Sequence, residues 1–162
     1  IAMLVSDEVK LMNILIANDG SEYGMAAVDL AADLINCRPG TKIKVVVVVE
    51  PATALEVETV IESVDDLTAP DNPDAQKAHE IGATSVRRLI DKCGSDGPDI
   101  SHEVLAGPAA RTIVERAEEW NADLIIVGSH GYGFWSRALL GSVSNRIASH
   151  ANCSVLIARV KT

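Results

Sequence analysis

The sequence is poor in aromatic residues and has no closely spaced cysteines. Phe, Trp and Tyr make up 3% of its 162 residues. The core must therefore consist of Val, Ile, Leu and Ala, a composition common where parallel strands are buried on both faces. The three cysteines, Cys37, Cys93 and Cys153, lie far apart without a C-x-x-C, so we expect neither a disulfide framework nor a zinc site. A reducing, cytoplasmic location agrees with this pattern.

Long apolar runs and an excess of basic residues are also missing. No run approaches the ~20 residues that span a bilayer, and residues 1–5 are too few for the apolar core of a signal peptide. The formal net charge of −9 argues against binding to nucleic acid or to an anionic membrane. The four histidines lack the spacing of a metal site. We therefore expect a soluble protein without nucleic-acid or membrane partners.

The length and the 48% hydrophobic content fit one folded domain. We assign this domain to residues 12–162 and interpret residues 1–11 as an extension or an expression-derived segment, because they show no clear period. Residues 50–80 hold nine acidic residues and one basic residue, whereas residues 121–162 hold one acidic and four basic residues. The C-terminal part is therefore the part that best tolerates a polyphosphate.

Strand and helix patterns alternate along the chain and predict an α/β fold. Val45–Val49 is an unbroken β-branched run, which is typical of a buried central strand. Ile100–Leu105 alternates in polarity and suits an edge strand. The order requires right-handed crossovers, and therefore a parallel sheet with helices on both faces. The predicted strands are 12–18, 42–49, 100–105, 124–127 and 155–160, and the predicted helices are 21–37, 75–93, 109–120 and 142–150.

A glycine-rich loop follows the fourth predicted strand. It contains Gly128-Ser129-His130-Gly131 and, nine residues later, Gly141-Ser142-Val143-Ser144, which opens the last helix. Glycines let the backbone approach a ligand closely, and the free N–H groups of a helix's first turn attract an anion. Ser142 and Ser144 can add hydroxyl donors or can cap the helix. The loop is a candidate phosphate site, and an ordinary strand-to-helix connection is the alternative.

The spacing of Gly128, Gly131, Gly141 and Ser142 resembles the nucleotide loop of the universal stress protein family. The resemblance extends to Asn13–Ala17 with Asp19-Gly20-Ser21, and to 107–109, 113–115 and 122–127. It implies an open five-stranded parallel sheet of order 3-2-1-4-5, Rossmann-like and similar to the adenine nucleotide alpha hydrolases. It also implies ATP as the ligand, and whether Mg²⁺ accompanies the ATP stays open. A matched family position makes Val48 an adenine contact.

In the implied sheet, the order reverses between the first and fourth strands, where open parallel sheets bind ligands. Asp19 lies there and can accept a hydrogen bond from a ribose hydroxyl or an adenine amino group. Its alternative role is an Asx turn or a helix cap. The predicted binding residues are Ala17, Asn18, Asp19, Val48, Val127, Gly128, Ser129, His130, Gly131, Gly141, Ser142, Val143 and Ser144.

Fast catalysis is not expected from this sequence. It has no G-x-x-x-x-G-K-[ST], and Gly128–Gly131 lacks the G-x-S-x-G arrangement that would make Ser129 a nucleophile. We predict an ATP-dependent switch or stress-response factor with no catalytic residues assigned. Slow ATP hydrolysis, and action through protein contacts without nucleotide, remain the alternatives.

The last predicted strand indicates a homodimer. In the order 3-2-1-4-5 it lies at a sheet edge, and Val155–Ala158 has no charge or proline to protect that edge. The same edge of a second copy is the simplest partner. The alternative is that residues 1–5 cover the edge within one chain.

Overall fold

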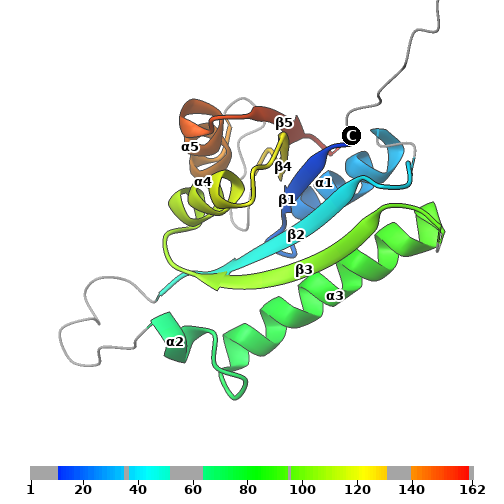
Figure 1. Cartoon of the computed structure of the whole chain (residues 1–162). Coiled ribbons are helices and arrows are strands. Elements are labelled where there is room, and N and C mark those ends of the chain that lie inside the picture. Colours follow the sequence, from blue (N-terminus) through cyan, green and yellow to red (C-terminus); the bar gives the residue numbers. More distant parts are fainter. Residues whose placement is uncertain (1–10, 35–36, 52–63, 95, 131–139, 161–162) are drawn as a thin grey trace, which may run out of the picture.

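A computed structural model describes residues 11–34, 37–51, 64–94, 96–130 and 140–160. Strands and helices alternate along this chain as the sequence predicts (Figure 1). The elements are β1 (Asn13–Ala17), α1 (Glu22–Leu34), β2 (Lys42–Val49), α2 (Val64–Leu67), α3 (Pro73–Cys93), β3 (Asp99–Ala106), α4 (Ala109–Glu119), β4 (Leu124–Gly128), α5 (Ser142–His150) and β5 (Ser154–Ala158).

The described strands form one five-stranded parallel sheet in the order β3-β2-β1-β4-β5. This confirms the predicted order, the edge position of β3 and the edge position of β5. β1 lies in the centre, with Ala17 opposite Val46 of β2 and Val127 of β4. β2 continues beyond this point and pairs with β3 as far as Val49 and Ala106.

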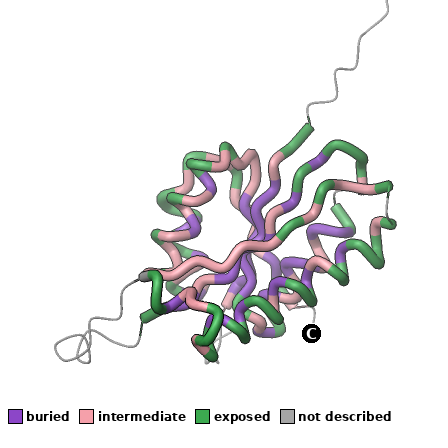
Figure 2. Tube along the Cα trace, turned by 60° about the horizontal axis from the view of Figure 1, so that its bottom comes forward, coloured by how far each residue is buried: buried purple, intermediate pink, exposed green. Residues whose placement is uncertain are grey.

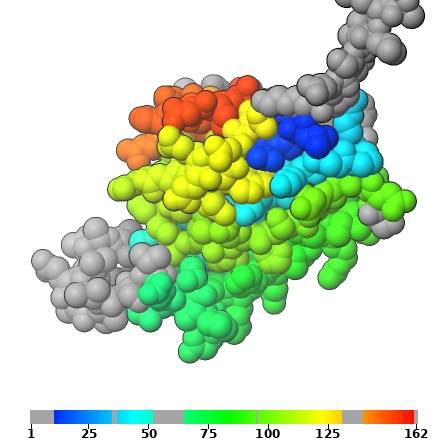
Figure 3. Space-filling view, viewed as in Figure 1, coloured from blue at the N-terminus to red at the C-terminus, as the bar shows by residue number. Residues whose placement is uncertain are grey.

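Helices cover both faces of the sheet. Alternate residues of β1 supply the two cores: Ile14 and Ile16 pack with α1 and α3, while Leu15 and Ala17 pack with α4 and α5. Figure 2 shows the buried residues concentrated along the strands, with exposed residues on the outer sides of the helices. In Figure 3, α5 and β5 lie at one edge of the molecule and α3 at the opposite edge. The aliphatic residues that the composition predicts for the core therefore fill two layers.

Element boundaries differ from the predictions by a few residues. β5 ends at Ala158 rather than at Val160. α3 begins at Pro73, because the side chain of Asn72 accepts hydrogen bonds from the N–H groups of Asp74 and Ala75 and so caps the helix. Within the acidic segment 50–74, the short helix α2 is described.

The expectation of no disulfide is wrong. Cys37 and Cys93 form one, with their Cα atoms 4.8 Å apart. Both α1 and α3 return antiparallel to the strands, so their C-terminal ends meet at the amino edge of the sheet. Cys93 is the last residue of α3, and Cys37 follows the end of α1. Sequence spacing could not reveal this proximity, and the cytoplasmic prediction loses one of its supports.

Candidate functional site

A cleft of about 390 Å³ opens at the carboxyl ends of β1, β2 and β4. It lies on the face that α4 and α5 cover, at the reversal of strand order where ligands of such sheets bind. Residues from both predicted motifs meet in it, although they lie far apart in sequence. Its lining consists of Ala17, Asn18, Asp19, Val46, Val48, Glu50, Ala109, Ile113, Val127, Gly128, His130, Gly141, Ser142, Val143 and Ser144.

The first turn of α5 faces this cleft without a side-chain cap. Gly141 occupies the cap position and has no side chain that could accept from the N–H groups of the first turn. The first helical bond from a backbone N–H runs from Asn145 to the Gly141 carbonyl. The N–H groups of Ser142, Val143 and Ser144 therefore lie ahead of the helical ladder, where an anion is favoured.

In each of the other described helices longer than one turn, a side chain accepts a hydrogen bond from a backbone N–H group of the first turn. In α1, the Ser21 hydroxyl accepts from the Gly24 N–H at 3.1 Å. In α4, Glu50 Oε1 accepts from the Ala109 N–H at 2.9 Å, and Asn72 caps α3. Of these helices, α5 is the one whose first turn receives no acceptor from a described side chain.

The glycine loop is closed at its base by backbone contacts. The Gly141 N–H donates to the Ser129 carbonyl at 2.8 Å. The Ser144 hydroxyl donates towards the Ser129 and Gly141 carbonyls, at 3.1 and 3.0 Å. Ser144 thus holds the loop to the helix, and the exposed Ser142 is the hydroxyl that remains for a ligand.

Two glycines let elements approach closely beside the cleft. A Cβ at Gly128 would lie 2.6 Å from the backbone carbonyl of Tyr23, so β4 could not end against α1 with a larger residue. A Cβ at Gly24 would collide with the side chains of Asn18 and Asp19. The start of α1 therefore packs tightly against the end of β4 and the turn after β1, beside the cleft.

Asp19 forms the Asx turn that the sequence left as its alternative role. Its Oδ1 accepts from the Ser21 N–H at 3.0 Å and from the Ser21 hydroxyl at 2.6 Å. Asp19 is exposed and lines the cleft. The turn fixes its carboxylate at the end of β1, so the turn and a ligand contact are compatible.

Asn18 turns its side chain away from the cleft. It is 4% exposed, and its Nδ2 donates to the Ser85 hydroxyl of α3 at 2.9 Å. Its Oδ1 accepts from the Gly20 N–H at 2.8 Å. Asn18 lines the cleft as predicted, but its amide group supports the turn that carries Asp19.

The end of β2 forms the other side of the cleft. The Asn18 N–H donates to the Val46 carbonyl at 3.1 Å, and the Gly107 N–H donates to the Val49 carbonyl at 3.0 Å. Backbone groups alternate between the two sides of a strand, so those of Val48 point to the side of β1. Because the pairing of β1 with β2 ends at Ala17 and Val46, the Val48 groups face the cleft.

Four lining residues are absent from the sequence prediction: Val46, Glu50, Ala109 and Ile113. The signal for Glu50 was its position directly after the β2 strand, at the same edge as Asp19. Gly131 lies outside the described residues. Ser129 is 2% exposed and is not among the lining residues described; its hydroxyl lies 3.1 Å from His130 Nδ1. No group of three His, Cys, Asp or Glu side chains that could hold a metal occurs among the described residues.

The model of the universal stress protein family matches residues 10–159. The chain belongs to the universal stress protein family. Universal stress protein MJ0531 of Methanocaldococcus jannaschii is 31% identical over 147 residues, which cover 90% of this chain and 81% of the relative.

Two solved structures with the same fold are complexes with an adenine nucleotide. A universal stress protein in complex with cAMP has a TM-score of 0.60 and 23% identity, over 92% of this chain and 97% of its own. One from Arabidopsis thaliana with AMP bound has a TM-score of 0.58 and 17% identity, over 93% of each chain. None of the described helices is long and apolar enough to cross a membrane.

Proposed function

We propose that this universal stress protein binds ATP in the cleft and acts as a nucleotide-dependent switch. The observation that carries the proposal is the uncapped first turn of α5, which faces the cleft beside Gly128 and Gly141. Phosphate oxygens would accept hydrogen bonds from the N–H groups there. The two relatives described with cAMP and AMP support an adenine nucleotide as the ligand class.

Val48 supports adenine as the base. Its carbonyl and N–H face the cleft next to each other, which matches the donor at adenine N6 and the acceptor at N1. Guanine in the same orientation presents the reversed pair, an acceptor at O6 and a donor at N1, and would leave both backbone groups unsatisfied. Asp19, at the end of the central strand, lies between these two ends of the cleft and would accept from a ribose hydroxyl.

The test is a charge placed in the first turn of α5. Ser142→Asp should leave the apo protein as stable as before or slightly more stable, because an acidic side chain suits a helix N-terminus. It should weaken ATP binding by at least roughly tenfold, because it repels phosphate. Asn145→Asp adds the same charge to α5 at an exposed position outside the lining and should change the affinity less than threefold.

Titration calorimetry with ATP and with adenosine separates the contributions of phosphate and base. Ser142→Asp should weaken ATP and spare adenosine. Equal ATP affinity in the wild type and Ser142→Asp would place the phosphates elsewhere. At a ligand concentration of one hundred times Kd, ATP should stabilise the wild-type fold by about 2.7 kcal/mol. Absence of any stabilisation by millimolar ATP or ADP would contradict nucleotide binding.

On this proposal, the protein binds ATP and does not hydrolyse it rapidly. The hydroxyl of Ser129 is buried behind the cleft, so it is poorly placed to attack a bound phosphate. Turnover should stay far below the ~10 per second typical of enzymes. Phosphate release near that rate, lost in His130→Ala, would favour an ATPase instead.

We further propose a homodimer through β5. The Ser129 N–H donates to the Ala158 carbonyl of β5, at 2.8 Å. Backbone groups alternate in direction along a strand. Those of Val155 and Ile157 therefore point outward from the sheet, while their side chains are half-buried. This edge offers free donors and acceptors to the same strand of a second copy.

A further inference from the structure

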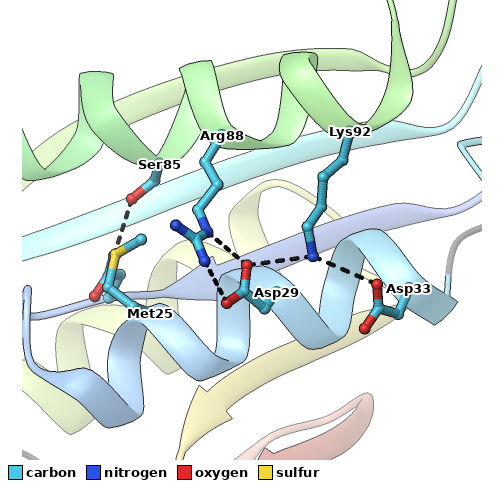
Figure 4. A network of polar contacts seen from close by, with 7 residues as sticks. Met25, Asp29, Asp33, Ser85, Arg88 and Lys92 are labelled. Atoms are coloured by element: carbon cyan, nitrogen blue, oxygen red, sulfur yellow. Dashed lines mark hydrogen bonds and ion pairs between the residues drawn. The ribbon is translucent and has the colours of Figure 1, made fainter.

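A line of contacts joins α1 and α3 from the cleft to the disulfide. Arg88 of α3 makes a two-pronged ion pair with Asp29 of α1, at 2.6 and 2.8 Å. Lys92 lies 3.4 Å from both Asp29 and Asp33. Figure 4 shows Met25, Asp29 and Asp33 one turn apart along α1, facing α3. The Cys37–Cys93 bond closes this line at the far end.

At the cleft end, the line reaches the nucleotide turn through one buried amide. Ser85 of α3 accepts from Asn18 Nδ2 at 2.9 Å and donates to the Ile81 carbonyl at 2.7 Å. Ser85 is fully buried. Asn18 in turn holds the Gly20 N–H next to Asp19. A displacement of α3 along α1 would therefore move the support of the turn that carries Asp19.

The ion pairs alone hold the two helices weakly. The hydrogen bond from Arg88 lowers the pKa of Asp29, so this carboxylate is charged at neutral pH. The side chains of Arg88 and Asp29 are nevertheless 49% and 32% exposed, and exposed pairs are screened by salt. The Cys37–Cys93 disulfide is the covalent bond among these contacts. It lies about two helical turns, or roughly 12 Å, from Ser85.

We propose that Cys37 and Cys93 are a redox site that reacts with small-molecule disulfides and controls how firmly α3 supports the nucleotide turn. The proposal rests on the proposed nucleotide function. One protein thiolate attacks the small-molecule disulfide and forms a mixed disulfide, releasing one small thiol. The second cysteine then attacks the protein sulfur of that mixed disulfide and releases the second thiol. The two protein thiols lose two electrons and two protons in total.

The oxidised protein is the form that binds nucleotide more tightly. With the bond closed, α3 cannot slide along α1 and Ser85 stays in reach of Asn18. Loss of that support should weaken ATP binding by roughly five- to tenfold, within the usual range of coupling between two sites. By linkage, bound ATP makes the disulfide harder to reduce by the same factor. A tenfold coupling corresponds to about 30 mV for this two-electron couple.

The first experiment titrates the thiols without nucleotide. The wild-type protein is equilibrated with mixtures of reduced and oxidised glutathione. Free thiols are then alkylated, and intact-protein mass spectrometry counts the alkylated cysteines. Cys37 and Cys93 should become protected from alkylation together, with a single midpoint in the glutathione ratio, while Cys153 remains a free thiol and is alkylated throughout. Burial raises the pKa of the Cys153 thiol, which makes it the slower nucleophile towards glutathione disulfide. Failure of the pair to close would overturn the proposal. Unfolding of the reduced protein, seen by circular dichroism, would make the bond purely structural and also overturn it.

The second experiment measures ATP affinity in the oxidised and reduced wild type. The affinity difference should grow as salt screens the ion pairs, and it should disappear in Ser85→Ala, which removes the link to Asn18. Cys153→Ser, the matched control, should behave as the wild type. Equal affinities in both redox states, or an undiminished difference in Ser85→Ala, would overturn the coupling.

Hydrogen exchange keeps the coupling testable without a nucleotide. The Gly20 N–H, which donates to Asn18, should exchange faster in the reduced protein. If ATP binds neither form while this exchange still responds to reduction, the proposed nucleotide function fails and the redox control of the turn stands. Unchanged exchange would refute that control as well.

Discussion

Replacing Gly24 with alanine tests whether the start of α1 and the nucleotide turn are built as one unit. A Cβ at this position would overlap the Asn18 side-chain oxygen and would lie 2.8 Å from Asp19 Oδ1. The Asn18 side chain cannot yield freely, because it bonds to the Gly20 N–H at 2.8 Å and to Ser85 at 2.9 Å. The substitution must therefore displace the turn or break these bonds.

The size of the effect follows from those bonds. The two hydrogen bonds, one buried and one partly buried, contribute about 1 kcal/mol each, and overpacking of a tight site costs about 1–3 kcal/mol. The better helix propensity of alanine returns about 1 kcal/mol. We expect a net loss of about 2–4 kcal/mol, or roughly 4–16 °C in melting temperature for a chain of this size. ATP affinity should fall at least roughly tenfold because Asp19 moves.

Gly82→Ala is the matched control within another helix. It makes the same chemical change in α3, but its Cβ would meet the ring of His102 on the edge strand β3, away from the cleft. Denaturant unfolding and titration calorimetry are run on both variants. Gly82→Ala should lose stability while keeping its ATP affinity within twofold. An unchanged affinity in Gly24→Ala, or equal affinity losses in both variants, would refute the reasoning.

Three further outcomes can be measured. Burial would raise the pKa of Glu103, but hydrogen bonds from Arg116 and Lys44 outweigh it and lower that pKa. Its contribution to stability is thus present above the usual value of 4.5 and lost as pH falls through the lowered value. In denaturant unfolding at acid pH, Glu103→Gln should therefore lose less free energy of unfolding than the wild type. Reduction of the disulfide, whose cysteines are 56 residues apart, should destabilise the fold by about 4 kcal/mol, and an unchanged melting temperature would contradict the bond. Ile157→Pro should convert a dimer to a monomer in light scattering by removing an outward donor, and an unchanged mass would place the interface elsewhere.

The fold follows largely from local patterns. The β-branched run of Val45–Val49 indicates a buried strand. The alternation of strands and helices predicts a parallel sheet, because each helix connects two strands by a right-handed crossover. The strand order came from the family resemblance rather than from hydrophobic periodicity, because periodicity says which face of a strand is buried and not which strand lies next to it.

The glycine loop was visible in the sequence because backbone chemistry depends on residue type. Gly128 permits a close approach that a larger residue would prevent, and Gly141 lies in a tight contact with the loop backbone. Glycines at this spacing therefore indicate a phosphate site before any coordinates are known. The missing side-chain cap of α5 is a different matter. It required knowing that Ser21 and Glu50 accept from the first turns of α1 and α4 and that no described side chain caps α5.

Only the tertiary structure decided which distant residues meet. No disulfide was expected because the cysteines lie far apart without a C-x-x-C, yet Cys93 at the end of α3 and Cys37 beyond the end of α1 meet at one edge of the sheet. Asn18 was predicted as a binding residue; it lines the cleft, and its buried amide supports the turn that carries Asp19. A sequence specifies local conformation through each residue's own sterics and polarity, whereas contacts between elements depend on how whole helices and strands pack.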